Sequence, residues 1–91
     1  MSLDYSKGTV MLEFNTVSAK SPTVADIKRT FKLADDEIDA TYGGKGFVGV
    51  PDENGKYNFI AVISTEAGKR IQKNPPAGFV QIWPNSPIGP M

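Results

Sequence analysis

The sequence predicts an α+β fold, a ferredoxin-like βαββαβ sandwich in which a four-stranded antiparallel sheet carries two helices on one face. Three observations predict it. Strand and helix patterns follow one another as strand, helix, strand, strand, helix, strand; the third strand, residues 57–64, is the most apolar run; and Pro51 lies at the end of the second strand. In this topology the first and third strands are central, and proline suits an edge because it cannot donate to a ladder.

The first half of the chain begins with an alternating strand over residues 8–17. Alternation places Val10, Leu12 and Phe14 on one face, and Thr9, Glu13 and Asn15 on the other, where Met11 interrupts the polar pattern. This pattern is typical of a half-buried strand. A helix is then expected from residues 22–23 to 33–34, because Thr23 and Asp26 have capping-box spacing and the apolar residues that follow recur at helical intervals.

The second strand is predicted to begin at residues 38–42 and to resume at 47–50. The glycine-rich residues 43–46 between them favour a bulge or kink in an edge strand, although glycines can also form an anion-binding nest. They do not have the spacing of a phosphate-binding P-loop. Asn54-Gly55 is a strong hairpin signal and connects this strand to residues 57–64.

The second half is predicted to continue with a helix over residues 65–73 and a strand over residues 77–83. Thr65 is the expected cap of the helix, and Asn74-Pro75-Pro76 ends it. Simple alternation along the last strand predicts one face with Val80 and Ile82 and an opposite face with Phe79, Gln81 and Trp83. We expect a single domain over residues 1–83 and an extended C-terminal tail over residues 84–91.

Composition excludes several classes of function. The 91 residues contain no cysteine and no histidine, and ten basic residues balance ten acidic ones. Thiol and histidine catalysis and the usual zinc ligands are therefore absent, and no net charge favours nucleic acid or a membrane surface. Four carboxylates lie within residues 35–39, without the spacing of a calcium loop, so a solvated acidic loop is expected. We expect no enzyme activity, no cofactor and no metal.

The C-terminal half resembles a known family of inhibitors. A hairpin, a strand ending in Ser64-Thr65-Glu66-Ala67, a short charged helix over residues 68–73, Asn74-Pro75 and a strand over residues 78–83 are similar to the propeptide-type inhibitors of subtilisin-like serine proteases. That family includes inhibitory prodomains, which can also act as folding chaperones, and stand-alone inhibitors. The resemblance implies that the sheet docks on the protease and that the C-terminal tail lies in the active-site cleft like a product.

The resemblance assigns roles to residues near the end of the chain. Phe79, Gln81 and Trp83 would contact the protease surface, and Asn85 or Ser86 would stand where the family often has acidic residues that cap protease helices. The tail Ile88-Gly89-Pro90-Met91 would enter the cleft by strand addition. Met91 would fill the primary pocket and Ile88 the distal one, while Pro90 favours an extended backbone.

Two other functions are compatible with the same element order. The first is an RNA-binding module, since RNA-recognition motifs are also βαββαβ and residues 45–50 (KGFVGV) begin like their aromatic signature. The second is a small regulatory or dimerisation domain. The N-terminus does not read as a signal peptide, so the protein is expected to be cytoplasmic unless a leader has been removed, in which case it is extracellular.

Overall fold

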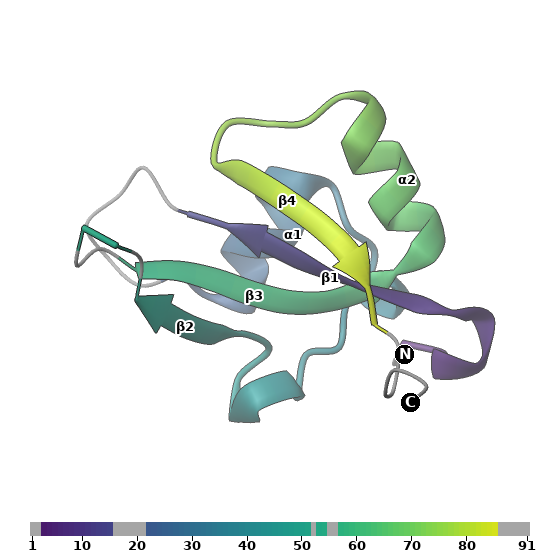
Figure 1. The fold of residues 1–91 in the computed structure, drawn as a ribbon. Coiled ribbons are helices and arrows are strands. Elements are labelled where there is room, and N and C mark those ends of the chain that lie inside the picture. Colours follow the sequence, from purple (N-terminus) through teal and green to yellow (C-terminus); the bar gives the residue numbers. More distant parts are fainter. Residues whose placement is uncertain (1–2, 16–21, 52, 55–56, 86–91) are drawn as a thin grey trace, which may run out of the picture.

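The computed structural model describes residues 3–15, 22–51, 53–54 and 57–85, which form an α+β fold with a four-stranded antiparallel sheet and two α-helices (Figure 1). The sheet order is β2-β3-β1-β4, so β1 and β3 are central, as the sequence predicted. The α-helices and strands are β1 (Thr9–Phe14), α1 (Val24–Phe31), β2 (Val48–Pro51), β3 (Tyr57–Ser64), α2 (Thr65–Lys73) and β4 (Phe79–Pro84). Of three short 3-10 helices, η1 (Tyr5–Lys7) precedes β1, while η2 (Asp35–Glu37) and η3 (Tyr42–Gly44) lie between α1 and β2.

The alternation in β1 divides the sheet into two faces. Leu12 and Phe14 are almost fully buried and belong to the main apolar core, which Val10 also contacts. Across the ladder Leu12 pairs with Ala61 of β3 and with Ile82 of β4. Burial of a large aliphatic or aromatic side chain stabilises the fold by about 1.5–3 kcal/mol, so this face of the sheet supplies much of the folding free energy.

Strand β2 is the edge that the proline predicted, but it is shorter than expected. It pairs antiparallel with β3 from Val48 to Pro51, which confirms the predicted hairpin. The predicted beginning of this strand at residues 38–42 is wrong, since Ile38 makes only an isolated bridge to Ile63 and is followed by η3. The glycines therefore lie in a turn before the strand and do not form a bulge within it.

Helix α1 begins where the sequence predicted. The side chain of Thr23 accepts a hydrogen bond from the amide of Asp26 (3.1 Å), and the Asp26 carboxylate accepts one from the Thr23 amide (3.1 Å). This reciprocal capping box satisfies two amides at the start of the helix. The helix ends at Phe31, and Lys32 then takes a left-handed conformation (φ 56°) as the C-cap.

Helix α2 follows β3 without a loop. Its cap is Ser64 and not Thr65 as predicted, because the Ser64 hydroxyl accepts a hydrogen bond from the Ala67 amide (3.1 Å). The helix ends at Lys73, directly before Asn74-Pro75-Pro76, which is the predicted end. Gly68 lets it approach the sheet closely, since a Cβ at this position would lie only 2.8 Å from a methyl carbon of Val10.

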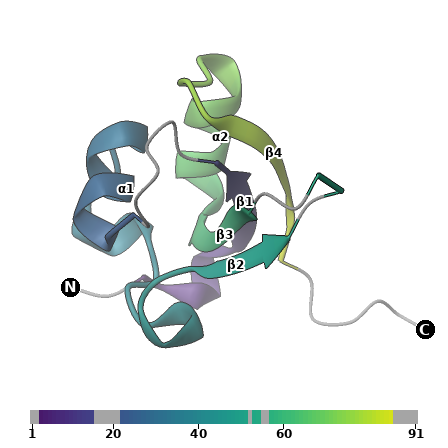
Figure 2. The same cartoon turned by 90° about the vertical axis from the view of Figure 1, so that its left-hand side faces the viewer.

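Both helices contribute to one apolar core. Ile27 and Phe31 of α1 and Ala67 and Ile71 of α2 belong to the same buried cluster as the core residues of β1 and β3. In this cluster the ring of Phe14 contacts that of Phe31 edge-on, with centroids 5.4 Å apart. Figure 2 shows α1 and α2 as neighbouring helices against the sheet.

An ion pair joins α2 to the chain that follows α1. The guanidinium of Arg70 donates two hydrogen bonds to the Glu37 carboxylate (3.0 and 2.9 Å) and one to the carbonyl of Lys32 (3.0 Å). Chiefly because of this pairing, the pKa of Glu37 is lowered from its ordinary value. Because the pair is partly solvated, its contribution is about 1 kcal/mol or less.

Candidate protein-binding face of the sheet

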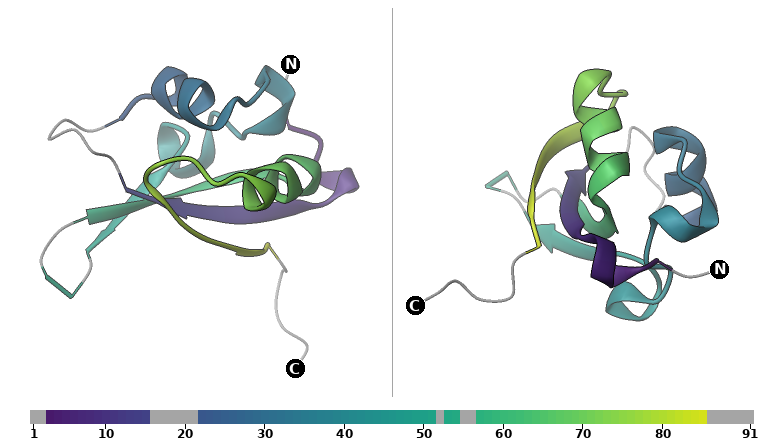
Figure 3. Two further views of the ribbon diagram at one scale, coloured as in Figure 1. Left: turned by 90° about the horizontal axis from the view of Figure 1, so that it is seen from above. Right: turned by 90° about the vertical axis from the view of Figure 1, so that its right-hand side faces the viewer.

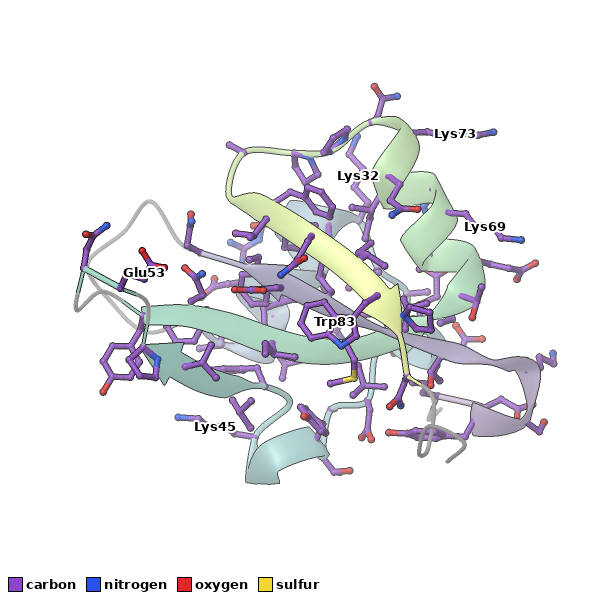
Figure 4. The ribbon with its side chains drawn as sticks, in the orientation of Figure 1. Lys32, Lys45, Glu53, Lys69, Lys73 and Trp83 are labelled. Carbon is purple, nitrogen blue, oxygen red and sulfur yellow. The ribbon has the colours of Figure 1, made fainter. Side chains whose placement is uncertain are left out.

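The face of the sheet opposite Leu12 and Phe14 carries a group of apolar side chains. They are in register across the strands, and Met11 of β1 pairs with Val62 on one side and with Trp83 on the other. Val62 is only 1% exposed, whereas its apolar neighbours on this face are half-buried. We call this surface the Trp83 face; its apolar members are Met11, Val48, Val50, Ile60, Val62 and Trp83. Figure 4 looks onto it, with Trp83 in front of the sheet.

A polar group lies in the middle of the Trp83 face. Glu13 of β1 accepts a hydrogen bond from the side-chain amide of Asn58 on β3 (2.8 Å) and a second from that of Gln81 on β4 (2.7 Å). Each donor is bonded to a different carboxylate oxygen of Glu13. The carboxylate is therefore held in one orientation by neighbours on both sides. Gln81 was predicted from the sequence as a surface residue, but Glu13 and Asn58 were missed because only the strand register brings them together.

The predicted faces of β4 are corrected by an irregularity in its pairing with β1. Phe14 pairs with Phe79 while Glu13 pairs with Gln81, so β4 has one extra residue, Val80, at this point. Phe79 consequently packs against the core, and the prediction that it shares a face with Gln81 and Trp83 is wrong. Val80, predicted to share a face with Ile82, is instead 39% exposed. A bulge of this kind changes which side chains point to each face, and simple alternation cannot detect it.

The end of β4 differs slightly from the prediction. The strand runs to Pro84, one residue beyond the expected end, and Pro84 pairs with Val10. Asn85 continues the contact with β1: its backbone amide donates to the carbonyl of Thr9 (3.2 Å), and its side-chain amide donates to the Thr9 hydroxyl (2.9 Å). Ser86, Ile88, Gly89, Pro90 and Met91 lie outside the described residues.

The acidic segment over residues 35–39 makes contacts within the protein. Asp35 forms an ion pair with Lys28 (2.5 Å), and this contact lowers the pKa of Asp35. Glu37 is paired with Arg70, as described above. Among residues 3–15, 22–51, 53–54 and 57–85, no group of three or more acidic side chains is arranged to hold a metal ion.

The glycine turn before β2 does not present free amides to an anion. The amides of Gly44, Lys45 and Gly46 donate to the carbonyls of Thr41 or Tyr42, at 2.9, 3.4 and 2.7 Å. An anion-binding nest needs such amides to point outward. The turn therefore connects η3 to β2 and has no group left for an anion at these three positions.

The segment that resembled an RNA-binding signature is also engaged in the fold. Phe47 is 3% exposed and packs edge-on against Phe59, with ring centroids 5.6 Å apart. The ammonium group of Lys45 lies 5.0 Å from the centroid of the Phe47 ring. A base-stacking aromatic has to be accessible, so Phe47 is not suited to this role.

Tyr5 and Asp39 supply a test of the pH dependence of stability. The Tyr5 hydroxyl donates a hydrogen bond to the Asp39 carboxylate, and desolvation together with this contact raises the pKa of Tyr5 to about 12. A raised pKa stabilises the fold fully below the ordinary value of 10.0, and this contribution is lost as the pH rises toward 12. The stability advantage of the wild type over Tyr5→Phe should therefore be constant from neutral pH to pH 10.0 and then decrease. Urea unfolding of both proteins across this range tests it, and parallel curves would contradict it.

In the described part of the chain, no helix has the length and apolar character needed to cross a membrane. Comparison with protein-family models, curated proteins and solved structures gives no significant match. A function for this chain therefore has to be inferred from its own residues and their arrangement.

Proposed function

We propose that this chain inhibits a subtilisin-like serine protease, as an inhibitor or as an inhibitory prodomain that can also assist folding. The Trp83 face docks on the protease surface, and the residues Ile88, Gly89, Pro90 and Met91 lie in the active-site cleft like a product. The proposed fold is the ferredoxin-like sandwich with both helices on one face of the sheet.

The strand order supports the fold part of this proposal. Read from the other edge, the order is β4-β1-β3-β2. Helix α1 connects β1 to β2 and helix α2 connects β3 to β4, and in each case one other strand lies between the two connected strands. The buried residues of α1 and α2 share one cluster with Leu12 and Phe14, which is the arrangement expected for helices on one face. The right-hand view of Figure 3 draws both helices on the same side of β4, which agrees with it.

The observation that carries the proposal is the apolar character of the Trp83 face. Half-buried Met11, Ile60 and Trp83 lie on the side of the sheet opposite the core cluster. Apolar side chains that remain partly accessible beside one another offer a surface on which a protein partner can complete their burial. Tryptophan is also the residue type most enriched among those that dominate binding energy.

The position of Asn85 limits where the cleft of a docked protease can lie. Asn85 is held against Thr9 beside the end of β4, and six residues, 86–91, follow it. Fully extended, six residues span roughly 20 Å. The cleft of a docked protease must then lie close to this corner of the sheet, which is consistent with docking through the strand that carries Trp83.

Titration of the protein into subtilisin, with a chromogenic peptide as substrate, tests the proposal. The full chain should inhibit, and a chain that ends at Asn85 should have an inhibition constant at least about tenfold higher, because burial of a methionine-sized side chain alone contributes about 1.5–3 kcal/mol. The melting temperature should stay nearly unchanged, since the truncation keeps β4 and the contact between Asn85 and Thr9.

Substitutions at the last residue provide matched controls. Met91→Asp removes the apolar side chain and should raise the inhibition constant as much as deletion of Met91 does. Met91→Leu keeps an apolar side chain of similar volume and should inhibit nearly as well as the wild type. Equal inhibition by the full and truncated chains would show that the tail does not lie in the cleft. No inhibition by the full chain would contradict the proposed function.

A further inference from the structure

Glu13 carries the negative charge of the polar group in the middle of the Trp83 face. Its two oxygens accept one hydrogen bond each, from the neutral amides of Asn58 and Gln81. Among the described lysines and arginines, none forms an ion pair with it. Asp26, Asp35 and Glu37, in contrast, are each paired with a basic side chain. The negative charge of Glu13 is therefore oriented by its neighbours without being neutralised by them.

We propose that Glu13 receives a cationic side chain of the docked partner, so that the Trp83 face selects a protein surface with one basic group opposite its centre. This inference rests on the proposed function, because it identifies the chemistry of the protease surface that the face contacts. It makes Glu13 a determinant of which protease is bound, in addition to the residues of the tail.

The reason is the cost of removing a charge from water. When a partner covers Met11, Ile60 and Trp83, it also excludes water from the carboxylate between them. A charge buried without a counter-charge is strongly unfavourable, whereas two neutral amides and one cation together satisfy it. The amides also fix the carboxylate before binding, so little side-chain freedom is lost when the cation arrives.

The same charge argues against the other occupants of this face. In a symmetric dimer the two-fold axis would bring the Trp83 face against its own copy, and the two Glu13 carboxylates would approach each other. Like charges placed together in an interface are strongly unfavourable. RNA would bring phosphates toward the same carboxylate. The residues that pair with Glu13 on the adjacent strands are Ile60 and Gln81, and neither offers an aromatic ring on which a base could stack.

The test compares Glu13→Gln with Glu53→Gln in the subtilisin titration. Glutamine is nearly isosteric with glutamate, and rotation of one neighbouring amide lets it keep both hydrogen bonds, so the fold should be retained. Glu53 is an exposed glutamate at the β2–β3 turn, well away from Trp83 in Figure 4, and controls for the loss of one charge. Inhibition constants are measured at low and high salt, and melting temperatures in parallel.

We expect Glu13→Gln to raise the inhibition constant at least about tenfold at both low and high salt, because a desolvated charge pair is lost and salt screens such a pair only weakly. Glu53→Gln should change it by less than about twofold. If the wild type inhibits and Glu13→Gln inhibits equally well, the inference is overturned while the proposed function stands. If the wild type does not inhibit, both the inference and the proposed function are overturned. A wild-type dimer in sedimentation that Trp83→Glu dissociates would overturn the inference in favour of a second copy.

Discussion

Trp83→Glu is expected to raise the inhibition constant for subtilisin by about tenfold to a hundredfold while the protein stays folded. Trp83 is half-buried beside Met11 on an edge strand, and docking of the proposed protease would complete its burial. Loss of a central tryptophan from an interface commonly costs 2 kcal/mol or more, and about 1.4 kcal/mol corresponds to tenfold in affinity. The introduced carboxylate would also have to be desolvated next to Glu13, which adds to the loss.

Two further variants separate binding from folding in this experiment. Tyr57→Glu replaces another aromatic side chain, 59% exposed and on the opposite side of β3, and should leave inhibition unchanged. Phe79→Glu should instead lower the melting temperature severely, because the structure places Phe79 against the core and a charge cannot be buried there without a partner. The inhibition constant and the thermal midpoint are measured for each protein. If Trp83→Glu lost stability as Phe79→Glu does, Trp83 would belong to the core.

Gly78→Ala is expected to reduce the free energy of unfolding by about 3–4 kcal/mol, whereas Gly44→Ala should reduce it by about 1–2 kcal/mol. The two glycines have almost the same positive φ, +93° at Gly78 and +89° at Gly44. A Cβ on Gly44 would meet no atom within 4 Å, but one on Gly78 would lie 2.4 Å from the carbonyl oxygen of Asn15. Gly44→Ala thus measures backbone strain alone, and the difference measures the steric conflict.

The position of Gly78 explains why relaxation is difficult. The Asn15 amide donates to the Gly78 carbonyl (2.8 Å), which holds the two backbones together at the start of β4. Moving Asn15 away would break this bond and disturb the pairing of the central strand. Urea unfolding of the two variants tests the prediction, and equal losses would show that the backbone here can shift at little cost.

The sequence predicted those parts of the fold that depend on local patterns. Alternation in β1 identified Leu12 and Phe14 as core residues, Pro51 marked an edge strand, and the Thr23–Asp26 capping box marked the start of α1. Each of these signals lies within a few residues of the element that it defines. They are sufficient for the number of strands, the two helices and the central position of β1 and β3.

The sequence was insufficient where one strand determines the geometry of another. The extra residue in β4 appears only when its pairing with β1 is known, and it moves Phe79 from the predicted binding face into the core. Glu13 and Asn58 are 45 residues apart, and nothing local relates them. The tail residues Ile88 to Met91 remain a prediction from sequence, since they lie outside the described part of the chain.

The contact between Thr9 and Asn85 has a mechanical consequence. It joins the first residue of β1 to the residue after β4, at one end of an antiparallel ladder. Tension applied to the chain on either side of this contact would act across the ladder, along the direction of its hydrogen bonds. The bonds would then break one pair at a time, like a zipper, beginning with Asn85. The domain should therefore unfold at a low force when it is pulled through Thr9 and Asn85, although the same ladder resists forces directed along its strands.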